Sequence, residues 1–100
     1  MISVPIKLDK ERQLRLTLGA MAAFEAVTGK NLLQGLDIAQ FSATDMRALI
    51  WACLTHEDPT LKLEDVGKMI DVADLPMIAE KLGELWNKSV PASDPLSTSP

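Results

Sequence analysis

The sequence predicts a mainly α fold: a small helical domain of about four to five helices, an N-terminal β-hairpin and a disordered C-terminal tail. Apolar residues alternate with polar ones only near the N-terminus. Further along they recur at spacings of three and four, the helical period. The last eleven residues, VPASDPLSTSP, contain three prolines and little to bury. We therefore expect a single domain at residues 1–89, with its hairpin at about residues 2–17, and a disordered tail at residues 90–100.

The hairpin is indicated by a period of two on both sides of a polar break at residues 9–12. The alternating apolar residues are Ile2, Val4, Ile6, Leu8, Leu14 and Leu16. Pro5 has no N–H for a neighbouring strand, which indicates an edge strand. Because a lone hairpin is only marginally stable, its apolar face must rest on the helices.

The first helix is predicted over residues 18–28. Thr17 can cap its start, and Gly29 stands where a glycine commonly ends a helix. The residues expected to face inward are Ala20, Ala23, Phe24 and Val27. Asn31 then opens a short helical segment at residues 32–36.

The most complete helix signal runs from Phe41 to Pro59. Ser42 is the expected N-cap, with Asp45 three residues later at the positive end of the helix, and Thr44 is the alternative cap. One helical face is wholly apolar, and its residues are Met46, Leu49, Ile50, Cys53 and Leu54. Neighbouring apolar residues broaden this stripe, so the helix is either central to the core or partly available to a partner.

Two further helices are predicted after Pro59. A short one covers residues 63–70, and residues 71–73 form a turn. Asp74 can cap the last helix, in which Glu84 and Lys88 form a favourable pair. The apolar face of this last helix consists of Ile78, Leu82, Leu85 and Trp86.

The composition argues against several classes of protein. The formal net charge is −4 and there is no run of Lys and Arg, so a nucleic-acid-binding surface is not supported. A single cysteine, Cys53, excludes an internal disulfide and fits a reducing compartment. No apolar run approaches the roughly 18 residues of a membrane span, and the N-terminus lacks the pattern of a signal peptide. We expect a soluble, cytoplasmic protein.

The residues do not predict an enzyme. His56-Glu57-Asp58 is the one cluster suited to catalysis or metal binding, and it lacks a second histidine, so a polar helix end is the simpler interpretation. Cys53 shares the apolar stripe, which favours a buried, inert thiol. Gly29-Lys30 lacks the context of a phosphate loop. No catalytic residue, cofactor site or metal site is therefore expected.

The tryptophans permit two interpretations. Trp51 and Trp86 fit either the core or an interface, where tryptophan is enriched. Trp51 lies about 100° around the helix from Ile50, at the margin of the apolar stripe, and is the better interface candidate. Met46, Met69 and Met77 are expected to fill the core, although methionine also suits adaptable binding surfaces.

Three stretches carry a family resemblance: LRLTLGAMAAFEAVTGKNLL, ALIWACLTHEDPTL and EDVGKMID. Together with the order of elements over residues 2–88, they resemble the phage tail assembly chaperone family, in the branch that includes the small tail protein of gene transfer agents. The resemblance implies a protein of the host cell cytoplasm that binds and solubilises the tape-measure protein during tail morphogenesis. It implies reversible apolar contacts between a helix and a groove, without catalysis. The tail tube protein and a second copy of the chain are further candidate partners.

The resemblance also implies that apolar positions of the central and last helices contact the partner. The expected partner-binding residues are Trp51, Leu54, Leu85 and Trp86, followed by Met46 and Met77. The alternative is that all six belong to the core. Alternative functions are a structural minor tail or head–tail component retained in the virion, and a helical adaptor unrelated to phages. Some members of the family are labelled tail tube protein, but a tube subunit needs a large β-sandwich, and this sequence predicts one hairpin.

Overall fold

A computed structural model describes residues 2–35 and 37–89, so the predicted disordered tail lies outside the described residues. The described part is mainly helical and begins with a two-stranded hairpin, which confirms the predicted fold class. Its elements, in order, are β1 (Val4–Lys7), β2 (Glu11–Leu14), α1 (Leu18–Thr28), η1 (Leu32–Gln34), η2 (Ile38–Gln40), α2 (Ala43–Leu54), α3 (Leu63–Met69), η3 (Val72–Asp74) and α4 (Leu75–Ser89), where η denotes a 3-10 turn.

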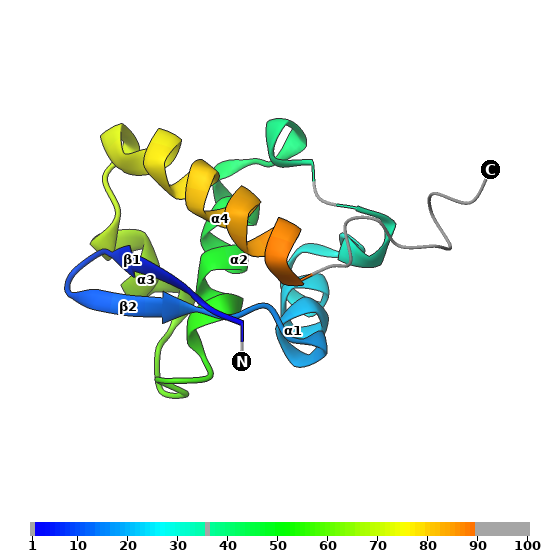
Figure 1. Ribbon diagram of the computed structural model, residues 1–100, viewed down its shortest axis with the longest axis horizontal. Helices are drawn as coiled ribbons and strands as arrows, with labels where there is room; N and C mark the ends of the chain where they lie inside the picture. The colour runs from blue at the N-terminus through cyan, green and yellow to red at the C-terminus, as the bar shows by residue number, and fades with distance from the viewer. Residues whose placement is uncertain (1, 36, 90–100) are drawn as a thin grey trace.

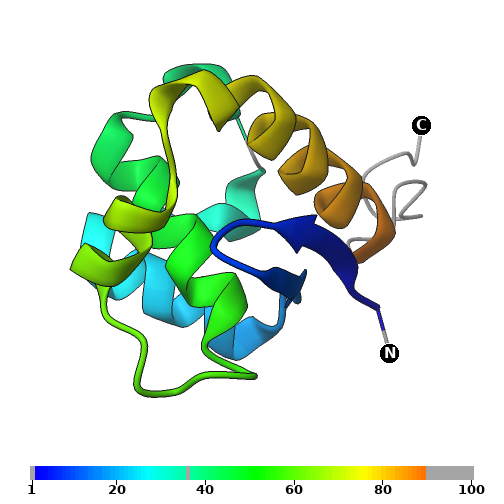
Figure 2. The ribbon, with the colours of Figure 1, turned by 90° about the vertical axis from the view of Figure 1, so that its left-hand side faces the viewer.

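Helix α2 lies at the centre of this arrangement (Figures 1 and 2). Helices α1 and α3 pack against it on one side, and β2 contacts it on the other. Helix α4 runs across the hairpin and contacts β1 and η3. The apolar face of the hairpin therefore rests on helices, as the sequence predicts.

The hairpin differs from the prediction in its turn. β1 and β2 are antiparallel, with Ile6 opposite Arg12, and the turn lies at residues 8–10 and not at residues 9–12. Arg12 is therefore a strand residue, and it is only 4% exposed. Its charge is stabilised by Asp9, which accepts bonds from Nε at 2.8 Å and from Nη2 at 2.9 Å. Arg12, paired with Asp9, thus occupies an inward-facing strand position that the alternation of apolar residues did not predict.

The residues after α2 cover the outer edge of β2. His56 Nε2 donates to the Gln13 carbonyl at 2.6 Å, and the Gln13 N–H donates to Glu57 Oε1 at 3.3 Å. The Gln13 backbone therefore faces away from β1, and Pro5, which stands opposite Gln13, lies at a position where no strand-to-strand bond is needed. His56 and Glu57 form a polar helix end, as predicted, and they also occupy an exposed strand edge.

Helix α1 has the predicted bounds and caps. Thr17 Oγ1 accepts a bond from the Ala20 N–H at 3.0 Å, and Gly29 adopts a left-handed conformation with φ of 76°. Phe24 is buried and stacks on Phe41 at 5.5 Å between ring centroids. Val27, predicted to face inward, is instead 38% exposed. It lies about 60° around the helix from Phe24, outside the helix face that the Phe24–Phe41 stack covers.

The short helical segment after α1 begins as predicted. Asn31 Oδ1 accepts a bond from the Leu33 N–H at 2.9 Å. The 3-10 turn η1 ends before Gly35, which has φ of 122°. Residue 36, the predicted last residue, lies outside the described residues.

Helix α2 begins at the predicted cap, where Ser42 and Asp45 bond each other's backbone reciprocally. It ends at Leu54, and Glu57 and Asp58 both donate their N–H groups to the Leu54 carbonyl, which closes a final turn before Pro59. The whole predicted stripe is buried, together with two alanines beside it: Met46, Ala48, Leu49, Ile50, Ala52, Cys53 and Leu54.

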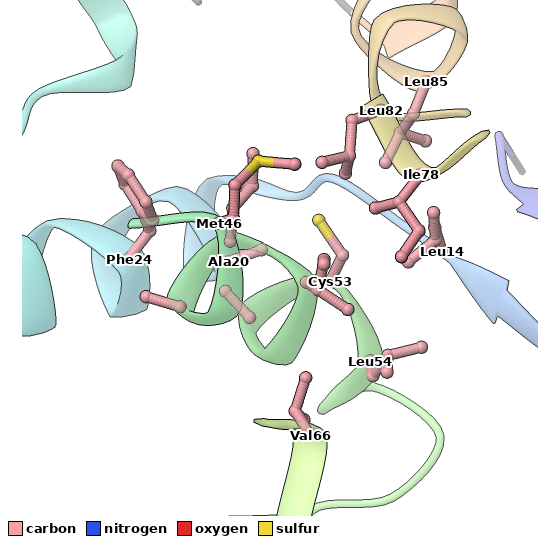
Figure 3. Packing of buried hydrophobic residues seen from close by; sticks show 14 of the residues in the cluster. Leu14, Ala20, Phe24, Met46, Cys53, Leu54, Val66, Ile78, Leu82 and Leu85 are labelled. Atoms are coloured by element: carbon pink, nitrogen blue, oxygen red, sulfur yellow. The ribbon is translucent and has the colours of Figure 1, made fainter. Parts of the chain in front are cut away.

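The C-terminal helices follow the prediction closely. α3 ends one residue earlier than predicted, and the predicted turn is the 3-10 turn η3, whose last residue, Asp74, immediately precedes α4. Ile78, Leu82 and Leu85 are buried, and Trp86 is half-buried. In Figure 3, Ile78 and Leu82 lie on the side of the core toward which Met46 and Cys53 project from α2. Val66 of α3 lies on the opposite side of α2.

Removal of the Asp45 carboxylate should weaken the fold in a pH-dependent way. Asp45 is 5% exposed, caps α2 and accepts a bond from Lys30 Nζ at 2.9 Å. A hydrogen bond from the Ser42 backbone N–H and, to a smaller extent, the contact with Lys30 lower the pKa of Asp45 below its ordinary value of 3.8. The stabilisation is therefore complete above about pH 4 and is lost as the pH falls through the lower folded-state pKa. We predict that Asp45→Ala lowers the free energy of unfolding by about 1–2 kcal/mol at neutral pH.

Urea denaturation at about pH 7 and about pH 2.5 tests this prediction, because the difference from the parent should shrink at the lower pH. Glu64→Ala, an exposed first-turn carboxylate on α3, is the matched control and should change stability little at either pH. An equal loss for Asp45→Ala at both pH values would contradict a role for the ionised carboxylate.

Candidate partner-binding groove

An apolar groove of about 260 Å³ opens between the N-terminal half of α2, the end of α3 and the start of α4. Polar residues at the groove are Thr44, Arg47 and Asp71. Its larger apolar lining residues are Met46, Ile50, Ile70, Val72 and Leu75. We call this feature the α2–α3 groove.

Helix geometry places Met46 and Ile50 on the same face of α2, because residues four apart are neighbours on a helix surface. Both are buried, so they form the base of the groove. Ile70 leaves α3 with extended backbone, φ −122° and ψ 123°, and carries the chain over to η3. Val72, in η3, is 81% exposed and therefore stands at the rim. The groove thus has an apolar base and an apolar rim that water reaches.

Arg47 is the charged residue of α2 at this groove. Its Nε is buried, and the described residues include no hydrogen-bond partner for it. Gly67 of α3 lies against its stem, since a Cβ at position 67 would stand 3.2 Å from Arg47 Cδ. The groove therefore combines apolar walls with a guanidinium whose position α3 restricts.

A second, more open depression lies beside β1 and has a volume of about 380 Å³. It is lined by Pro5, Ile6, Lys7, Glu11, Met77 and Lys81. Half of these residues are charged, and Met77, 37% exposed, is its main apolar contact from α4. Charged side chains make this surface a weaker candidate for binding an apolar partner.

The structure does not gather the six residues that were predicted to bind a partner. Met46 lines the α2–α3 groove, and Met77 lines the second depression. Leu54 and Leu85 are at most 1% exposed, so partner contact at these positions would require the domain to open. Trp51 and Trp86 are half-buried and pack against the core. The predicted assignment of these six residues to a partner remains a prediction.

Sequence reasoning missed Arg47 and Val72 as groove residues. Val72 was predicted to lie in a turn. An apolar side chain in a turn is difficult to cover, and this could have marked Val72 as a contact residue. Arg47 stands directly beside the apolar stripe of α2, but periodicity alone assigns such a residue to a solvated face. Whether the Arg47 side chain finds a hydrogen-bond partner depends on α3 and η3, which are not adjacent to α2 in the sequence.

Trp51 has a structural contact of its own. Its Nε1–H donates to the Leu61 carbonyl at 2.8 Å, which ties the connector after α2 back to the helix. Leu61 is buried, so this carbonyl has little access to water. Trp51 therefore stabilises the fold whether or not it also contacts a partner.

Nucleophilic chemistry is not supported at Cys53. The thiol is fully buried, and burial raises its pKa to about 12, so it is protonated at neutral pH. Across residues 2–35 and 37–89, no cluster of three or more His, Cys, Asp or Glu side chains is placed to hold a metal ion. No helix in that same part of the chain has the length and apolarity needed to cross a membrane.

Comparison with known protein families gives a match over most of the chain. The model of a family described as "Phage tail tube protein, GTA-gp10" matches residues 6–85, from β1 into α4, and so includes the whole α2–α3 groove. The comparison finds no curated protein and no solved structure that matches the chain.

The Trp51 hydrogen bond predicts a stability change from a conservative substitution. Trp51→Phe keeps an aromatic ring but leaves the buried Leu61 carbonyl without its donor, so the free energy of unfolding should fall by about 1–2 kcal/mol. This corresponds to a decrease in Tm of about 4–8 °C per kcal/mol for a domain of this size.

Trp86→Phe is the matched control for thermal unfolding. Trp86 is also half-buried, but within the described residues its ring N–H has no hydrogen-bond partner. The Tm of the Trp86→Phe variant should therefore decrease less than the Tm of Trp51→Phe. If Trp51→Phe leaves the Tm unchanged and weakens partner binding, Trp51 is an interface residue and the structural role is wrong.

Proposed function

The chain belongs to the phage tail assembly chaperone family, in the GTA-gp10 branch, and we propose that it binds and solubilises the tape-measure protein during tail morphogenesis. The family is non-catalytic, and membership implies tail proteins as partners. The tape-measure protein is the specific partner that we propose, and the host cell cytoplasm is the proposed place of action.

The observation that supports this proposal most is an apolar groove within a domain of this family. A tape-measure protein is a very long helical chain that exposes apolar stripes until the tail tube forms around it. A groove between helices suits such a ligand, because one apolar stripe of an amphipathic helix can lie against Ile70, Val72 and Leu75, which are not fully buried. The groove is small, so each contact is expected to be weak and reversible, with many copies covering one chain.

The family description also contains the words tail tube protein, which favour a second candidate: a structural minor tail or head–tail component retained in the virion. A tube subunit requires an extensive sheet, whereas residues 2–35 and 37–89 contain one two-stranded hairpin. The outer edge of β2 is occupied by His56 and Glu57 and is not free to extend the sheet. These features favour the chaperone. Mass spectrometry of purified particles separates the candidates, because stoichiometric presence in mature tails would contradict the chaperone.

Co-expression with the tape-measure protein tests the proposal. We predict that the parent chain raises the soluble fraction of the tape-measure protein and is recovered in a complex with it. Val72→Gln should reduce both effects, because it places a polar group on the exposed rim of the groove. Since Val72 is 81% exposed, the substitution should change stability by less than about 0.5 kcal/mol.

Leu33→Gln is the matched control, because Leu33 is a similarly exposed apolar residue, 71%, away from the groove. It should retain the activity of the parent. Unchanged solubility of the tape-measure protein with the parent chain, and no complex, would refute the proposed function. Equal losses for both variants would refute the assignment to the groove.

A further inference from the structure

We infer that Arg47 makes the α2–α3 groove selective for a helix that carries a carboxylate within its apolar stripe, and that the guanidinium binds this carboxylate. The inference rests on the proposed function, because the occupant is a helical segment of the tape-measure protein. It adds a chemical feature of the segment that neither the family match nor apolar packing supplies.

The first argument is the Arg47 Nε, which lacks a hydrogen-bond partner among the described residues. This atom is buried, and a buried unsatisfied donor is unfavourable. Arg12, another arginine that packs into the domain, shows the contrast, because Asp9 binds it through two oxygens at 2.8 and 2.9 Å. A ligand carboxylate at Arg47 would provide the kind of pairing that Arg12 has within the chain.

The second argument is the position of the guanidinium. Arg47 is one helical turn from both Ala43 and Ile50 on α2, and all three line the groove. Because position 67 is a glycine, the Arg47 stem can pass close to α3: a Cβ at this position would stand 3.2 Å from Arg47 Cδ. The Arg47 side chain therefore has reduced conformational freedom before a ligand binds. A restricted, planar guanidinium binds a carboxylate with less loss of side-chain entropy than a free lysine would.

The third argument is charge complementarity inside the groove. Its walls are apolar apart from Arg47, Asp71 and the hydroxyl of Thr44. Asp71 forms no ion pair with Arg47 within 4.0 Å in the described part of the chain, so it does not neutralise the cation at contact distance. Asp71 would instead repel a ligand carboxylate placed beside it, which favours one orientation of the bound helix. An apolar helix with one acidic side chain fits this combination.

Binding to synthetic peptides tests the inference. The probes are overlapping peptides of about 25 residues that cover the tape-measure protein, long enough for several helical turns, and affinity is measured by fluorescence anisotropy. For peptides with Asp or Glu in an apolar stripe, Arg47→Gln should weaken binding by about ten- to a hundredfold. Lys68→Gln is the matched control, because it removes the same charge from an exposed residue of α3 that does not line the groove.

The peptide side provides a test that does not alter the fold. Changing the acidic residue of a bound peptide to its amide should weaken binding to the parent chain by a similar factor. The same change should have little further effect on Arg47→Gln, because the two substitutions remove one contact. If the peptide amide binds the parent chain as tightly as the acid, the inference is wrong even if Arg47→Gln fails to fold.

The outcomes separate the inference from the function on which it rests. If the parent chain binds no tape-measure peptide, both are overturned. If it binds peptides, and Arg47→Gln and Lys68→Gln bind them equally well, the carboxylate contact is overturned and the proposed function stands. If the chain alone forms dimers that Arg47→Gln abolishes, a second copy is the occupant, and the inference is overturned.

Discussion

Burial of α2 on almost every side is the constraint on which the rest of this structure depends. A short helix cannot remain apolar around most of its circumference in water, so every neighbouring element has to cover part of it. α1 does so with Phe24, α3 with Val66 and α4 with Ile78, all fully buried. The hairpin contributes Leu14 and joins α2 through a bond from the Arg15 N–H to the Cys53 carbonyl at 3.1 Å.

Polar contacts at the two ends of α2 fix its position relative to the elements that pack around it. At the N-terminal end, Asp45 caps the helix and binds Lys30, which follows α1. At the C-terminal end, His56 and Glu57 bond the backbone of β2. α1 and the hairpin are thus both tied to the central helix. Beside the buried Met46 and Ile50, the neighbouring α3 and η3 leave the α2–α3 groove. The same helix therefore supplies the core of the domain and the wall of the candidate site.

Local chemistry explains what could be predicted from the sequence. Thr17 and Gly29 predict the bounds of α1, and Ser42 with Asp45 predicts the start of α2, because caps act within a few residues. The buried stripe of α2 follows from periodicity in the same way. The failures involve partners or surroundings that local patterns do not contain. Arg12 was left in a polar break because its burial depends on Asp9 across the turn, and Val27 was placed inward although it is 38% exposed.

The groove required the structure for the same reason, since its walls come from α2 and from segments about twenty residues later. The central claim is that a helix of the tape-measure protein binds between these walls. Hydrogen–deuterium exchange of the chain, alone and with the tape-measure protein, measures this directly. The account predicts slower exchange at residues 43–50 and 67–75, with α1 and the hairpin little changed. Protection centred on α1 or the hairpin, or no protection in a verified complex, would contradict it.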